Sequence, residues 1–103
     1  MNGADILMIK VNIVFDNALE DADIIAVPDE FISEIEAIGQ NFLNEIPAMG
    51  NDYRTVINGQ EYFVAETDGF IKWFNLHYCS ATEKAYIVAK NTNYCPQYKT
   101  IEF

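Results

Sequence analysis

The fold is decided by residues 28–46, which read PDEFISEIEAIGQNFLNEI. Apolar side chains recur there at steps of three and four residues, which is the spacing of one face of a helix. They are Phe31, Ile35, Ile38, Phe42 and Ile46, with Ile32 and Leu43 widening the stripe. Pro28, Asp29 and Glu30 suit a helix start, because proline lacks the donor that would go unpaired and the acids face the positive end of the helix dipole. Gly39 lies mid-helix at a cost of about 1 kcal/mol relative to alanine, which predicts close packing against it.

Towards the N-terminus, residues 6–15 alternate between apolar and mixed positions and predict a strand. One face is apolar and the other, with Met8, Lys10 and Asn12, is partly wet. The apolar face consists of Leu7, Ile9, Val11, Ile13 and Phe15. Residues 16–23 predict an acidic loop, and residues 24–27 predict either a short strand or a lead into the helix.

Towards the C-terminus, Asn58 and Gly59 predict a hairpin, because a two-residue type I′ turn needs positive φ at both positions. In that register Ile57 faces Gln60, Thr55 faces Tyr62 and Tyr53 faces Val64, and these six residues form the expected core face. The opposite face carries Arg54, Val56, Glu61 and Phe63.

A second helix is predicted from Thr67 or Asp68 to about Tyr78, with an apolar stripe of Phe70, Trp73, Phe74 and His77. Residues 85–90 and 99–103 predict two further strands, the latter at a sheet edge. The order β-α-β-β-α-β favours a single α+β domain over residues 1–103. We expect a mostly antiparallel sheet of four to five strands with two helices on one face, and a ferredoxin-like arrangement is one instance of it.

Length and composition limit the function classes. The chain has 103 residues, half of them hydrophobic, and a net charge of −10. Such a charge disfavours direct binding to nucleic acid or to an anionic membrane. No window approaches eighteen apolar residues, and the start lacks the basic region of a secretory signal. Two cysteines, Cys79 and Cys95, are expected to be free thiols in a cytoplasmic protein.

The charges are unevenly distributed along the chain. Residues 1–53 hold 11 acids and one base, whereas residues 54–103 hold five of each. Acid blocks repel themselves, and they often serve attraction to a basic partner. The predicted partner-binding residues are Asp21, Asp23, Asp29, Glu30, Glu34 and Glu36. The plainer interpretation is a solvated surface, because acids near a helix start are stabilised by its dipole.

Other chemistry has weaker support. Asp21 and Asp23 resemble a fragment of a calcium loop, but the glycine and the closing glutamate are misplaced, so no metal is predicted. His77 and Cys79 lie two residues apart, and such positions on a helix point to different sides. Glycine-rich phosphate loops are absent, so no cofactor is predicted. Tyr94 and Tyr98, around Pro96, are secondary candidates for partner contact.

These features favour a non-enzymatic protein: a small acidic inhibitor that occludes a basic, nucleic-acid-binding site on another protein, such as a nuclease. Immunity proteins against toxins and phage proteins that block host defence act in this way. One alternative is a small cytosolic enzyme using His77 with a cysteine or carboxylate. Another is a homodimer or other homo-oligomer whose half-covered sheet is buried by a neighbour.

Overall fold

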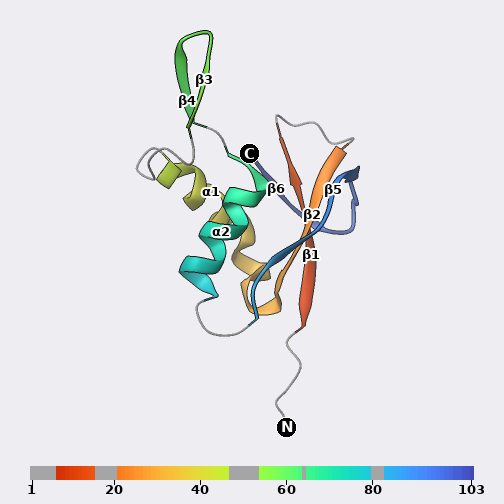
Figure 1. Ribbon diagram of the computed structural model, residues 1–103. Coiled ribbons are helices and arrows are strands. Elements are labelled where there is room, and N and C mark those ends of the chain that lie inside the picture. Colours follow the sequence, from red (N-terminus) through yellow and green to blue (C-terminus); the bar gives the residue numbers. More distant parts are fainter. Residues whose placement is uncertain (1–6, 16–20, 47–53, 64, 80–82) are drawn as a thin grey trace.

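A computed structural model describes residues 7–15, 21–46, 54–63, 65–79 and 83–103 (Figure 1). The elements follow one another as β1 (Met8–Val14), β2 (Asp21–Pro28), the 3-10 helix η1 (Asp29–Glu34), α1 (Ile35–Glu45), β3 (Arg54–Ile57), β4 (Gln60–Phe63), α2 (Thr67–Tyr78), β5 (Tyr86–Asn93) and β6 (Lys99–Glu102). This is an α+β chain. None of the described helices has the length and apolarity that crossing a bilayer needs.

Four strands form one sheet in the order β5-β2-β1-β6. β1 pairs with β2, and β2 with β5, in antiparallel fashion, whereas β1 and β6 run parallel. The sheet is therefore mostly antiparallel, as expected. Both helices lie on the same side of it (Figure 1), with α1 next to β6 and α2 next to β5.

The core lies between the sheet and the helices. Alternate side chains of β1 and β2 enter it, among them Val11, Ile13 and Ile25, which have no exposed surface. The predicted stripe of the first helix is confirmed: Ile35, Ile38, Phe42 and Ile46 are buried, and Phe31, Ile32 and Leu43 pack against them. The Phe42 ring meets Phe70 at 5.4 Å and Trp73 at 5.3 Å between ring centroids. Aromatic packing thus joins the two helices.

Gly39 is where α1 approaches the sheet most closely. A Cβ atom at this position would lie 2.7 Å from Cγ2 of Ile101 on β6. The close packing predicted for this glycine is confirmed. The absence of a side chain lets the α1 backbone lie directly on the edge strand.

The second face of the sheet is partly covered by the connection from β5 to β6. Tyr94 and Tyr98 pack against Val14, Ala22 and Ile24 there. Asn12, on the face predicted to be partly wet, has no exposed surface. The connection crosses above Asn12 and excludes water from it. The alternation of apolar and polar residues along a single strand cannot predict this covering.

The predicted element order is wrong in two places, and the ferredoxin-like arrangement is not confirmed. Residues 21–28 form a full strand, although residues 21–23 were expected in a loop. Asp29–Glu34 is a 3-10 helix and not the first turns of α1. The third difference is topological: β3 and β4 pair only with each other and form a separate two-stranded sheet.

The hairpin turn itself is confirmed, with φ of +52° at Asn58 and +82° at Gly59. The register is also confirmed for Ile57 with Gln60 and for Thr55 with Tyr62. The predicted core face is wrong, since Ile57 is 55% exposed and Tyr62 46%. The hairpin projects away from the four-stranded sheet (Figure 1), so neither face packs on that sheet. Tyr53 and Val64 lie outside the described residues.

Candidate functional site

Four carboxylates lie together on η1 and the first turn of α1. Asp29, Glu30, Glu34 and Glu36 are all exposed, because they occupy the positions between the apolar residues that face the core. We call these four residues the acidic face. None of them forms an ion pair with a lysine or arginine that the structure describes. The last turn of α1 also has no base. Among the described residues, no ion pair therefore neutralises the negative charge of this helix surface.

Asp21 and Asp23 do not join the acidic face. They lie at the start of β2, whereas Asp29 follows directly after its last residue, Pro28. A strand of this length separates its ends by about 20 Å at 3.3 Å per residue. The acid-rich segment is continuous in the sequence, but β2 carries its two parts to opposite ends of the sheet. Asp21 remains exposed.

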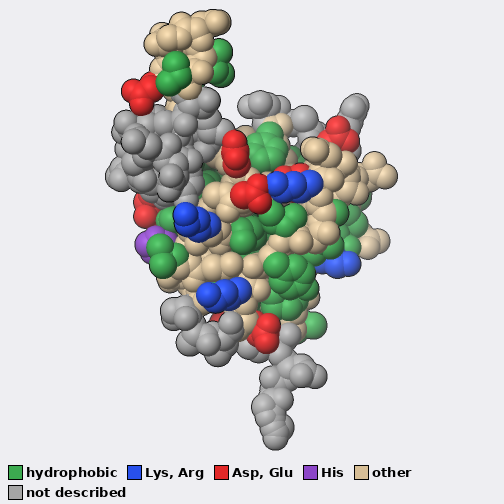
Figure 2. All heavy atoms as spheres, viewed as in Figure 1, with side chains coloured by type: hydrophobic (Ala, Val, Ile, Leu, Met, Phe, Trp, Pro, Cys, Tyr) green, Lys and Arg blue, Asp and Glu red, His purple; other side chains and the backbone are tan. Residues whose placement is uncertain are grey.

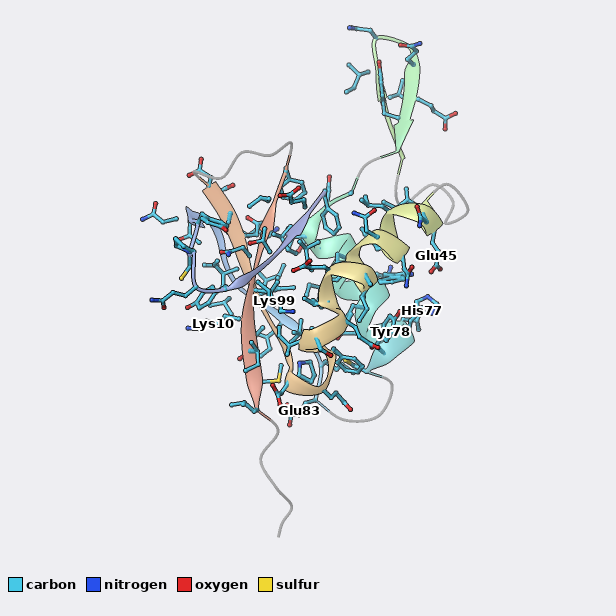
Figure 3. All side chains as sticks on the ribbon, turned by 180° about the vertical axis from the view of Figure 1, so that it is seen from behind. Lys10, Glu45, His77, Tyr78, Glu83 and Lys99 are labelled. Carbon is cyan, nitrogen blue, oxygen red and sulfur yellow. The ribbon has the colours of Figure 1, made fainter. Side chains whose placement is uncertain are left out.

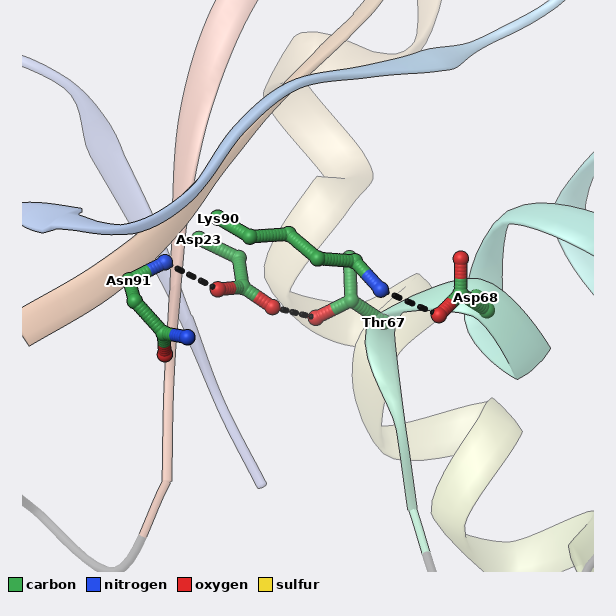
Figure 4. A network of polar contacts seen from close by, with 5 residues as sticks. All are labelled: Asp23, Thr67, Asp68, Lys90 and Asn91. Atoms are coloured by element: carbon green, nitrogen blue, oxygen red, sulfur yellow. Dashed lines mark hydrogen bonds and ion pairs between the residues drawn. The ribbon is translucent and has the colours of Figure 1, made fainter.

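Asp23 is instead held by two hydrogen bonds within the fold (Figure 4). One carboxylate oxygen accepts a hydrogen bond from the Thr67 hydroxyl at 2.5 Å, and the other accepts one from the backbone N–H of Asn91 at 3.0 Å. Beside them, Lys90 Nζ pairs with Asp68 at 2.5 Å. These contacts connect β2, the irregular part of β5 and the start of α2. Asp23 is therefore already engaged within the fold.

Three of the described lysines gather on or beside α2 and β5. Lys72, Lys84 and Lys90 are exposed on or beside α2 and β5, and blue side chains gather over this region in Figure 2. Figure 3, seen from behind, places Lys10 and Lys99 on the sheet, away from Glu45, His77 and Tyr78 on the helical side. Lys90 pairs with Asp68 at the start of α2, whereas Lys84 and Glu30 both lie within electrostatic reach of the Cys79 thiol.

A groove of about 530 Å³ runs between α1 and β6. It is lined by Glu36, Ala37, Gln40, Thr100, Ile101 and Glu102. Glu36 belongs to both the groove and the acidic face, so the two surfaces are continuous. Gln40, Thr100 and Glu102 were missed by the sequence reasoning. No linear pattern identifies them, because the groove exists only where the C-terminal strand lies parallel to β1.

Tyr94 and Tyr98 are less available than expected. Both are half-buried against the second face of the sheet. The Tyr94 hydroxyl oxygen also accepts a hydrogen bond from the Thr100 hydroxyl at 3.3 Å. Their rings stabilise the connection above Asn12, which leaves only part of each side chain for a partner.

His77 and Cys79 differ sharply in environment. His77 is exposed at the margin of its predicted apolar stripe, with its ring centroid 5.3 Å from that of Trp73. Cys79 is buried, and this burial raises the pKa of its thiol, with the negative charge of Glu30 adding to the effect. A raised pKa lowers the thiolate fraction and hence nucleophilicity at neutral pH. Cys79 and Cys95 are both free thiols, as predicted.

The described residues contain no group of three or more His, Cys, Asp or Glu side chains able to hold a metal ion. The groove between α1 and β6 does not include His77. Of the six acids expected to bind a partner, the fold brings four together, separates Asp21 and uses Asp23 internally. Comparison with protein-family models, with curated proteins and with solved structures gives no match for this chain.

Proposed function

We propose that this protein is a small non-enzymatic inhibitor that binds a basic, nucleic-acid-binding surface of another protein through the acidic face. The observation that carries the proposal is the set of four exposed carboxylates on η1 and α1, none of which forms an ion pair with a described lysine or arginine. Clustered like charges cost stability through mutual repulsion, and a basic partner would convert that cost into attraction. Immunity proteins and phage anti-defence proteins are the classes that this proposal fits, and the cytoplasm is the proposed compartment.

The test is the association rate with the captured partner, measured against ionic strength. The protein is immobilised, its partner is isolated from the cells that produce it, and binding is followed for the wild type and for Glu30→Lys combined with Glu34→Lys. Both side chains are exposed, so the fold is expected to survive the change. The association rate should fall as salt shortens the Debye length from about 10 Å at 0.1 M to about 3 Å at 1 M. At low salt the double reversal should slow association about tenfold or more.

A matched control is Glu61→Lys combined with Glu66→Lys. These residues are also exposed, and the change in net charge is the same, but they lie on β4 and directly before α2. Their reversal should slow association clearly less than reversal on the acidic face. An association rate that is flat in salt, with normal binding by the Glu30 and Glu34 variant, would show that the acids are only a solvated surface.

A second candidate function has one observation in its favour. Tyr86 and Val88 on β5 are 52% and 44% exposed, and Leu7 before β1 is 61% exposed. A homodimer could cover these side chains, as in the oligomeric alternative. Sedimentation velocity of the wild type and of Val88→Lys decides this point: a concentration-dependent dimer that the substitution abolishes would support it.

A further inference from the structure

The sheet has two edges, and they differ in how well they are protected against further pairing. β5 is irregular: its register with β2 shifts between Ala22 and Ile24 and again between Ile24 and Ile25, and Asn91 has a φ of +50°. Bulges and lysines such as Lys90 are devices that protect an edge from pairing. β6 instead pairs with β1 in an unbroken register over four residues. Its outer edge meets no other described strand.

The backbone groups on the outer edge of β6 can be assigned from one hydrogen bond. The N–H of Phe103 donates to the carbonyl oxygen of Val14 on β1 at 2.9 Å. Successive residues of a strand direct their N–H and C=O groups to opposite sides. Ile101 therefore faces β1 with its backbone, like Phe103, whereas Thr100 and Glu102 direct their N–H and C=O groups away from the sheet. An edge strand of this kind is a template for another strand.

A groove lies beside this edge. Its floor is β6, through Thr100, Ile101 and Glu102, and its other wall is α1, through Glu36, Ala37 and Gln40. The close approach of Gly39 to Ile101 places α1 directly over the edge. Its volume of about 530 Å³ is within the usual range for clefts that take small ligands.

The charge of the groove selects the occupant. Glu36 and Glu102 are both exposed in its lining. Lys99, at the start of β6, does not line it, and neither does any other described lysine or arginine. We propose that an extended basic segment of the partner protein adds to β6 as a fifth strand of the sheet, between Glu102 and α1. This inference rests on the proposed function and names how the basic partner docks.

The alternation of strands defines the chemistry of that segment. Thr100 and Glu102 share a face with Asn12, since the Asn12 amide donates to the Thr100 hydroxyl at 3.3 Å. Side chains of the added strand on that face lie beside Glu102, where lysine or arginine would be paired. Side chains on the other face lie under α1, where a small apolar residue packs against Ala37 and a longer base reaches Glu36. Main-chain bonds supply affinity and these positions supply specificity, as in other cases of strand addition.

The test uses a seven-residue peptide of alternating lysine and valine with blocked ends. The peptide is titrated up to about millimolar concentration, so that weak binding with a Kd in that range is detected. Binding is followed by amide hydrogen exchange and NMR shifts of the full chain. The amides of Thr100 and Glu102 should gain protection, whereas that of Ile101 should change little, because it already faces β1. A peptide of alternating glutamate and valine is the matched control and should bind at least about tenfold more weakly.

Glu102→Pro removes one outward N–H without removing a bond to β1, since proline is tolerated at the solvent side of an edge strand. It should weaken peptide binding about tenfold or more. Glu102→Gln and Glu36→Gln keep the backbone and remove a charge, and each should weaken binding severalfold; they preserve the test if the proline variant does not fold. Unprotected Thr100 and Glu102 amides at saturation, or equal binding of the two peptides, would overturn the proposal.

The captured partner distinguishes this inference from the proposed function. If Glu30→Lys with Glu34→Lys slows its association but Glu102→Pro binds it normally, the acidic face is functional and strand addition at β6 is wrong. If neither variant affects the partner, both are wrong. A loss of partner binding by both, with protection of the Thr100 and Glu102 amides in the complex, supports both.

Discussion

Asn12→Ala is expected to be among the most destabilising polar substitutions in this protein. The side chain is fully buried and holds the connection between β5 and β6 to the sheet. Its Nδ2 donates to the carbonyl of Cys95 at 2.8 Å, and its Oδ1 accepts the backbone N–H of the same residue at 3.1 Å. A single amide thus satisfies both backbone groups of a residue 83 positions away.

The magnitude follows from these two bonds and from what their loss leaves behind. Each hydrogen bond contributes about 1 kcal/mol net. The Cys95 carbonyl still accepts the Tyr98 N–H at 3.1 Å, so only the Cys95 N–H loses its partner, which costs about 1–3 kcal/mol in a water-poor site. Cys95 is half-buried, so water can reach part of the vacated site. We expect the free energy of unfolding to fall by about 3 kcal/mol. At about 4 °C per kcal/mol for a domain of this size, Tm should fall by about 12 °C.

The assay is urea unfolding followed by circular dichroism, with hydrogen exchange of the Cys95 amide as a local readout. Asn75→Ala is the matched control, since Asn75 makes the same pair of bonds to the backbone of Ala85, at 2.8 and 3.0 Å, from a half-buried position. It should cost about 1–2 kcal/mol, because Asn75 is itself half-buried and water can enter the space that its amide leaves, although Ala85 is buried. Equal losses for the two variants, or a loss below about 1 kcal/mol for Asn12→Ala, would refute the reasoning.

Three further outcomes are expected. Gly39→Ala should destabilise the protein by about 1–3 kcal/mol through overlap of the new Cβ with Ile101 Cγ2, despite alanine's higher helix propensity. In a double-mutant cycle, Ile101→Ala should recover part of this loss. Additive effects of the two substitutions would contradict the contact. Gly59→Val should cost about 1 kcal/mol or more in urea unfolding through its positive φ alone, as no atom lies within 4 Å of the added Cβ; a neutral result would contradict the turn. Cys79 should be alkylated more slowly than Cys95 at neutral pH, and its rate should rise only at more alkaline pH, because burial raises the pKa of its thiol. Equal alkylation rates of the two cysteines by mass spectrometry would contradict the burial of Cys79.

The sequence predicts which residues of the candidate site are charged, but not where the fold places them. The helical spacing of Phe31 to Ile46 leaves Glu30 and Glu34 off the apolar stripe, and both are exposed in the structure. It cannot show that Asp23 hydrogen-bonds to Thr67, 44 residues away. The linear sequence does not distinguish the roles of neighbouring acidic residues. Whether a carboxylate is free for a partner depends on which donors the fold brings to it.

Local rules were sufficient where the determining interactions are local. The Asn58-Gly59 turn, the two apolar helix stripes and the need for a close neighbour at Gly39 all follow from backbone conformation and from spacing within one element. The tertiary structure alone decided that the hairpin stands apart from the sheet, that Asn12 is buried and that the groove beside β6 exists. Each depends on pairing between segments distant in sequence, above all the parallel pairing of β6 with β1. Such pairing depends on the packing free energy of the whole core, which cannot be deduced from any single segment.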